Sequence, residues 1–103
     1  MKASKKINWY IGPTTKGGAI LKEVKTIDRV VKLLELSSIN CFSTSIQTGF
    51  WEGKQEQTLV ITLVDTTNLG ETLVQNIASL FAKEFNQDCV LCTIEEIKYN
   101  FVS

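Results

Sequence analysis

Apolar residues recur along the chain at two spacings, which separate expected strands from expected helices. In residues 7–11, the apolar side chains of Ile7, Trp9 and Ile11 alternate with polar positions, and Gly12 with Pro13 ends the run. A period of two is typical of a strand with one buried face. The chain is therefore expected to begin with a strand.

Spacings of three and four appear in two segments and predict two helices. The first helix is expected to begin at Thr26, as its N-terminal cap, and to end near residues 37–38. Its apolar stripe consists of Ile27, Val30, Val31 and Leu34. The second follows Asn68 and Glu71, whose spacing resembles a capping box, and should end at Asn86. Its apolar stripe consists of Leu73, Ile77, Leu80, Phe81 and Phe85.

Three further stretches are rich in β-formers. Residues 41–51 and 58–65 predict two antiparallel strands joined by a six-residue hairpin, "EGKQEQ". Residues 89–103 begin as a buried strand and continue with apolar and polar residues in alternation. We expect this last strand to be long and to include Ile97, Tyr99 and Phe101.

The expected order of elements is β-α-β-β-α-β in one domain, residues 1–103, which is the ferredoxin-like α+β plan. This plan packs two helices on one face of a four-stranded antiparallel sheet, here with an extended C-terminal strand. Both apolar helical stripes need the same sheet face. The opposite face is therefore free to meet water, a ligand or another subunit.

Charge is balanced overall, with 11 basic and 11 acidic residues, but it is unevenly distributed. Residues 1–32 hold eight basic and two acidic side chains, whereas residues 33–103 hold three and nine. A basic N-terminal third favours an anionic ligand or an acidic partner. No apolar run is long enough to span a membrane or to form a secretory signal, so we expect a cytoplasmic protein and no membrane partner.

The chain contains no histidine. This argues against Ser-His and Cys-His nucleophiles and against histidine-bound metals. The only arginine, Arg29, falls within the first expected helix, which argues against an acylphosphatase-like anion loop. We therefore expect no catalysis, no cofactor and no catalytic residue.

The chain has three cysteines, Cys41, Cys89 and Cys92. This number is small and odd, which argues against a disulfide framework. The spacing of Cys89 and Cys92 is that of a metal or redox pair. On a strand, however, residues three apart point to opposite faces. We expect buried, unreactive thiols and no metal site.

The segment "IGPTTKGG" is the most site-like polar stretch. Its glycines allow close approach, its threonines offer hydroxyls, and its lysine can offset phosphate charge near the start of the next helix. It lacks the residue order of a P-loop, and an ordinary connection is the alternative. The expected ligand site, with an aromatic ring stacked on a base, comprises Tyr10, Gly12, Thr14, Thr15, Lys16, Gly17, Gly18 and Trp51.

In "TGFWEG", Phe50 and Trp51 should point to opposite faces of their strand. Phe50 shares parity with Ile46 and is expected to point inward, which leaves Trp51 exposed. The open sheet face predicts a homo-oligomer. Its expected interface consists of Trp51, Val60, Val64, Ile97, Tyr99 and Phe101. RNA recognition is disfavoured because "TLVITLVD" lacks the basic, glycine and aromatic pattern of RNA-binding strands.

The layout "NWYIG … TGFWEGKQEQTLVI" resembles small uncharacterised proteins of phages and mobile elements, some of which look ferredoxin-like. That resemblance implies a counter-defence role, by sequestering a signalling nucleotide or by blocking a host defence protein.

Two functions remain open. The first is a non-catalytic oligomer that binds a small anionic, nucleotide-like ligand, and the glycine-threonine-lysine loop favours it. The second is an interaction module that binds or inhibits a host protein through its open sheet face, without a small ligand. Ile97, Tyr99 and Phe101 favour this alternative.

Overall fold

The computed structural model describes residues 1–65 and 67–103, except for the side chain of Trp51. The elements follow one another in the predicted β-α-β-β-α-β order. They are β1 (Lys2–Ile11), α1 (Glu23–Leu36), β2 (Ser43–Trp51), β3 (Lys54–Asp65), α2 (Glu71–Glu84) and β4 (Leu91–Tyr99). The predicted ferredoxin-like α+β fold is confirmed.

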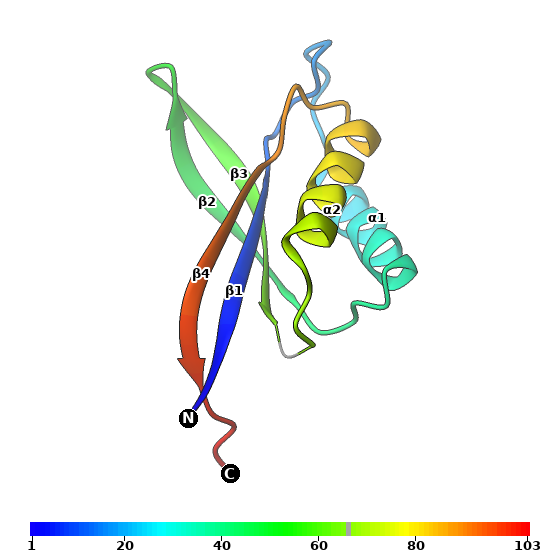
Figure 1. Ribbon diagram of the computed structural model, residues 1–103. Coiled ribbons are helices and arrows are strands. Elements are labelled where there is room, and N and C mark those ends of the chain that lie inside the picture. Colours follow the sequence, from blue (N-terminus) through cyan, green and yellow to red (C-terminus); the bar gives the residue numbers. More distant parts are fainter. Residues whose placement is uncertain (66) are drawn as a thin grey trace.

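The four strands form one antiparallel sheet in the order β2-β3-β1-β4, and both helices lie on one side of it (Figure 1). β1 starts at Lys2 rather than at residue 7, so it is longer than the apolar pattern predicted. Lys5 lies between two strands, opposite both Asp65 and Glu96, whereas residues 2–4 pair with β4 alone. Backbone pairing with these neighbours extends the strand where side-chain alternation gives no signal.

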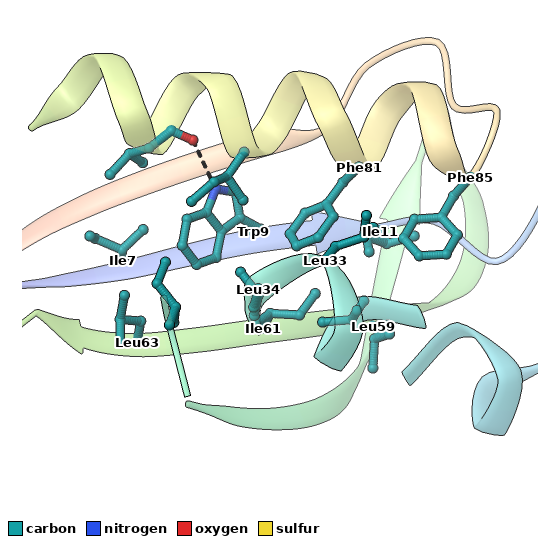
Figure 2. Packing of buried hydrophobic residues seen from close by; sticks show 14 residues of the cluster. Ile7, Trp9, Ile11, Leu33, Leu34, Leu59, Ile61, Leu63, Phe81 and Phe85 are labelled. Atoms are coloured by element: carbon teal, nitrogen blue, oxygen red, sulfur yellow. Dashed lines mark hydrogen bonds between the residues drawn. The ribbon is translucent and has the colours of Figure 1, made fainter. Parts of the chain in front are cut away.

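The core fills the space between the helices and the inward face of β1 and β3 (Figure 2). Trp9 is fully buried, and its ring meets Phe81 edge to face with centroids 5.9 Å apart. The indole Nε1 donates a hydrogen bond to the carbonyl of Val74, at 3.1 Å. An unpaired buried N–H would cost about 1–3 kcal/mol. This contact therefore allows a large aromatic ring with a polar atom to occupy the centre of the core.

The ends of the helices differ in part from the prediction. α1 begins at Glu23, with Lys22 as N-cap, and Thr26 lies inside the helix with its hydroxyl donating to the Lys22 carbonyl at 2.8 Å. The predicted cap is therefore wrong by one helical turn. The end of α2 agrees with the prediction, because Asn86 adopts the left-handed conformation (φ 49°) that follows many helices.

Asn68 and Glu71 do not form the predicted capping box. Gly70 is the N-cap of α2 and makes no side-chain capping bond. The buried Asp65 organises this connection instead, because its carboxylate accepts the backbone N–H groups of Thr67 (2.9 Å) and Leu69 (2.6 Å). A carboxylate at the end of β3 thus fixes the connection before α2 through donors other than those of a capping box.

The β2–β3 hairpin turns within two residues, Glu52 and Gly53, instead of the predicted six. Both have positive φ, 49° and 78°, as the tight turn preferred between antiparallel strands requires. Residues 54–57 continue β3 and pair with β2 as far as Trp51 opposite Lys54. The polar composition of these residues resembles a loop because both faces of this ribbon are largely exposed.

The predicted self-association surface needs one correction. Val60 is only 2% exposed in the single chain, so it is not available as a surface contact. Ile97 and Tyr99 belong to β4, as predicted, and lie opposite Ser4 and Lys2. Phe101, at 83% exposed, lies beyond the last strand.

The cysteines are less buried than predicted. Cys41 and Cys89 are exposed, and Cys92 is half-buried against the core, where burial raises the pKa of its thiol. Cys89 precedes β4, so the strand parity used for the prediction does not apply to it. No helix in residues 1–65 and 67–103 has the length and apolar character needed to cross a membrane.

Candidate functional site

Three connections gather at the end of the sheet that lies away from the chain termini (Figure 1). They are the β1–α1 loop (residues 12–22), the tip of the β2–β3 hairpin and the α2–β4 connection (residues 85–90). A cavity of about 400 Å³ lies among them. We call it the loop-end cavity, and its lining residues are Tyr10, Gly12, Pro13, Thr14, Thr15, Lys16, Gly49, Phe50, Glu56, Thr58, Gln87, Asp88, Cys89 and Leu91.

Five of the eight residues predicted for the ligand site line this cavity: Tyr10, Gly12, Thr14, Thr15 and Lys16. Gly17 and Gly18 belong to the same loop but do not line it. The predicted stacking role of Trp51 concerns a side chain outside the described part of the chain. The segment "IGPTTKGG" thus supplies one wall of the cavity.

The β1–α1 loop folds back on itself as a small hairpin. Thr14 and Ile20 form an isolated antiparallel bridge, and the Thr15 N–H donates to the Ala19 carbonyl at 2.8 Å. The Thr15 hydroxyl accepts the Ala19 N–H at 3.1 Å. Gly18 closes the turn at φ 85°, where a residue with a side chain would be strained. These bonds give the loop a defined shape, which an ordinary flexible connection would lack.

The backbone amides of this loop are largely engaged within the protein. The Gly12 N–H donates to Gln87 Oε1 (3.1 Å), the Lys16 N–H to the Asn86 carbonyl (2.7 Å), and the Gly18 N–H to the Thr15 carbonyl (2.9 Å). α1 starts only at Glu23, so Lys16 is not at its N-terminus. The predicted place of Lys16 near the start of this helix is therefore wrong. The loop also offers few free backbone amides as a phosphate cradle, and it presents side chains to the cavity.

The floor of the cavity is the end of the open sheet face. Trp9 points into the core, so Tyr10 points to the opposite side, as does its β4 partner Leu91. Glu56 and Thr58 share the outward parity of Val60, which is opposite Tyr10. The face that the helices leave uncovered thus forms part of this cavity.

Phe50 differs from its prediction. It has the strand parity of Ile46, as expected, yet it is 72% exposed because the hairpin extends beyond the helices that would cover it (Figure 1). Phe50 and Tyr10 supply aromatic surface to the cavity. Sequence reasoning assigned Phe50 to the core because parity gives the face of a strand but not where the covering layer ends.

The charged side chains of the cavity are Lys16, Glu56 and Asp88. No ion pair engages any of the three within the described residues. Two carboxylates and two aromatic rings suit an organic cation with a flat ring, and the lysine suits a carboxylate on the same molecule. The two acids were missed because they come from segments far from "IGPTTKGG", and because Glu56 fell in the predicted hairpin loop, where strand parity does not apply.

One family model and two solved structures match this chain. The model of the S-adenosylmethionine lyase family matches residues 21–102. A solved phage SAM lyase in the apo state is 17% identical, with a TM-score of 0.76, over 91% of this chain and 81% of that one. A phage SAM lyase in complex with S-methyl-5'-thioadenosine is 15% identical, with a TM-score of 0.75, over 90% of this chain and 81% of that one. No curated protein matches the chain.

At these identities, the two solved structures support the fold alone. The resemblance to phage proteins is confirmed, although these relatives are lyases rather than uncharacterised proteins. The expectation of a non-catalytic protein is wrong, because the matched family is a family of enzymes. The absence of histidine excluded only reactions that need an imidazole. Since the family model matches most of the sequence, the chain belongs to the S-adenosylmethionine lyase family.

Proposed function

We propose that this protein binds S-adenosylmethionine in the loop-end cavity and cleaves a carbon–sulfur bond of it. The family match over residues 21–102 is the observation that carries this proposal. The cavity is the proposed site because it combines charges of both signs, which make no ion pair in the described part of the chain, with aromatic surface.

The chemistry of the substrate suits the lining of this cavity. S-adenosylmethionine has no phosphate; it carries a sulfonium, an ammonium and a carboxylate group beside its adenosine. Glu56 and Asp88 are placed to attract the two cationic groups, and Lys16 to pair with the carboxylate. Tyr10 and Phe50 offer ring faces to the adenine or the sulfonium. A nucleotide-like ligand thus fits without the phosphate cradle that the loop does not offer.

Breaking the carbon–sulfur bond of a sulfonium releases a neutral thioether, so the leaving group needs no proton. Loss of S-methyl-5'-thioadenosine can follow attack of the substrate's own carboxylate on Cγ, which gives a lactone. It can also accompany removal of a proton from Cβ, which gives an unsaturated amino acid. The first route asks the protein mainly to hold a reactive conformation and exclude water, whereas the second needs Glu56 or Asp88 as a base. Neither route requires histidine.

Product analysis tests this function. Purified protein is incubated with S-adenosylmethionine in water enriched in oxygen-18, and the products are identified by mass spectrometry. We expect release of S-methyl-5'-thioadenosine well above that from substrate alone, with an unlabelled four-carbon product. A label in a hydroxyl group of the first-formed product would indicate hydrolysis instead. No release above the substrate-alone control contradicts the proposal.

We also propose a counter-defence role, which acts by turnover of a small molecule instead of by sequestering it. A binding protein must match its ligand molecule for molecule, whereas an enzyme lowers the concentration of a small molecule by turnover. Expression in a cell should then deplete S-adenosylmethionine, and the Glu56→Gln variant should do so less. An equal pool with parent and variant would contradict this role.

Self-association also remains a proposal, on a smaller surface. Val64 is 39% exposed on the open face, and Phe101 is 83% exposed with its ring 5.6 Å from that of Tyr99, between centroids. These apolar side chains favour a contact between copies of the chain. Truncation after Asn100 leaves β4 intact, so a reduced assembly in sedimentation would implicate residues 101–103 directly. A monomeric parent at micromolar concentration would overturn the proposal.

A further inference from the structure

Gln87 is a buried amide between two of the three connections that form the loop-end cavity. The residue is 8% exposed, and both polar atoms of its side-chain amide make hydrogen bonds. Nε2 donates to the carbonyl of Thr14 at 2.8 Å and to that of Phe85 at 3.3 Å, and Oε1 accepts the N–H of Gly12 at 3.1 Å. A neutral amide is suited to this position because it donates and accepts at the same time.

These bonds connect two of the segments that line the cavity. Gly12 and Thr14 belong to the β1–α1 loop, whose side chains form one wall. Asp88 and Cys89, which line the cavity from the α2–β4 connection, directly follow Gln87. A further bond between these segments runs from the Lys16 N–H to the Asn86 carbonyl. The Gln87 side chain therefore makes two of the three hydrogen bonds between these segments in the described residues.

Gly12 shows how closely the two segments approach. A Cβ added at Gly12 would lie 3.1 Å from Gln87 Oε1, which is tighter than most such contacts. The glycine thus allows the loop backbone to reach the amide. This geometry gives one reason for a glycine at position 12 that does not involve a ligand.

We propose that Gln87 is a positioning residue that sets the spacing of Lys16 and Asp88, which both line the substrate cavity. This inference rests on the proposed function, because that function makes the spacing of the walls matter for binding. Gln87 is expected to act on KM through the loop rather than by contact with the reacting atoms. Loss of its bonds should loosen the β1–α1 loop while the core around Trp9 stays intact.

The test uses Gln87→Glu, which keeps the shape of the side chain but changes its donors. An ionised carboxyl can accept from Gly12 but cannot donate to Thr14, and it faces the two carbonyls of Thr14 and Phe85. A protonated carboxyl restores the donor to Thr14. Burial beside carbonyl groups raises the pKa of the introduced carboxyl above its usual range. The effect of the substitution should therefore be large at pH 8 and smaller at pH 5.5.

Two measurements are made on the parent, Gln87→Glu and the control Gln75→Glu, which lies on the exposed face of α2. At pH 8, KM of Gln87→Glu should rise about tenfold with kcat within about twofold of the parent. The ratio to the parent should fall at pH 5.5. Tyr10, Lys16, Glu56, Asp88 and Cys89 line the same cavity in parent and variant, so the ratio to the parent at each pH isolates the effect of position 87. In the absence of substrate, amide hydrogen exchange at residues 15–18 should be faster in Gln87→Glu than in the parent at pH 8.

The outcomes separate this inference from the proposed function. A parent that releases no S-methyl-5'-thioadenosine overturns the proposed function. Unchanged loop exchange in Gln87→Glu overturns the positioning role, whether or not the parent is active. Equal KM in both proteins at both pH values also overturns it. If Gln87→Glu does not fold, Gln87→Met keeps the length without charge and should show a raised KM that does not depend on pH.

Discussion

The sheet carries a cavity at each end, and the two differ in what their charged side chains already do. The cavity near the termini is the larger, about 680 Å³, and contains two lysines, Lys5 and Lys98, and two acids, Asp65 and Glu96. Asp65 is bound to the connection that precedes α2. The loop-end cavity, about 400 Å³, holds three charges without ion pairs in the described residues. Lys5, Lys98 and Glu96 of the larger cavity also make no ion pair in the described residues. The two cavities therefore differ in the engaged Asp65 and in the number of aromatic rings, Tyr99 alone against Tyr10 and Phe50.

The largest difference between the cavities should appear in turnover. Glu56→Gln removes a negative charge that faces the proposed position of a substrate cation and keeps the side-chain shape. We expect kcat/KM to fall about 10- to 100-fold, because a charged hydrogen bond contributes about 1.5–3 kcal/mol. Glu96→Gln, in the larger cavity, should stay within about twofold of the parent. Equal losses in the two variants would remove the distinction between the cavities.

Asp65→Asn should show the opposite pattern, with loss of stability and retention of activity. The amide keeps an acceptor but loses the charge that holds the Thr67 and Leu69 N–H groups. Urea denaturation should give a free energy of unfolding lower by about 1–3 kcal/mol. Asp88→Asn, at an exposed position, should change it by less than about 0.5 kcal/mol. A catalytic defect in folded Asp65→Asn would assign the larger cavity to the reaction.

Lys16→Ala should raise KM about threefold, since a single exposed ion pair to the substrate carboxylate contributes little in water. Steady-state kinetics at low and high salt check this, because screening should reduce the difference between variant and parent. Stability should change by less than about 0.5 kcal/mol. Lys98→Ala serves as the matched control from the other end of the sheet. An unchanged KM in Lys16→Ala would remove Lys16 from the site.

The smallest expected effect is on the rate at which a thiol reagent modifies one cysteine of the loop-end cavity. S-methyl-5'-thioadenosine at a concentration equal to its Kd should slow modification of Cys89 about twofold, because Cys89 lines the loop-end cavity. Cys41, exposed elsewhere, should react at the same rate with and without the ligand. Cys92 should react slowly in both cases, since burial raises the pKa of its thiol. Equal protection of Cys41 and Cys89 would indicate binding away from the cavity.

Much of the fold could be predicted from the sequence because each element carries its own periodic pattern. Ile7, Trp9 and Ile11 marked the inward face of β1, and the stripe ending in Phe81 and Phe85 marked that of α2. The errors lie where tertiary contacts override local signals. The predicted capping box at Asn68 is absent, and Asp65 from the preceding strand binds the connection before α2 instead. The N-terminal extension of β1 depends on neighbours that the local sequence does not show.

The site was only partly predictable, for a related reason. Tyr10 and the loop through Lys16 lie close together in the sequence and could be found as one motif. Glu56 comes from β3 and Gln87 from the α2–β4 connection, and they meet that motif only when the sheet forms. The catalytic nature of the family could not be derived from the residues either, because cleavage of a sulfonium needs no familiar catalytic group. A site that acts by holding its substrate in a reactive conformation needs no particular residue type, so the amino-acid composition does not reveal it.

The pairing of β1 also has a consequence for how this chain folds as it is made. β1 is synthesised first but lies in the middle of the sheet, with β3 on one side and β4 on the other. The pair of Lys2 and Tyr99 joins nearly the whole length of the sequence. Such non-local contacts slow folding, since much chain entropy is lost before they form. Until the ribosome has released residues 91–99, one edge of β1 lacks its partner and is open to pairing with other nascent chains.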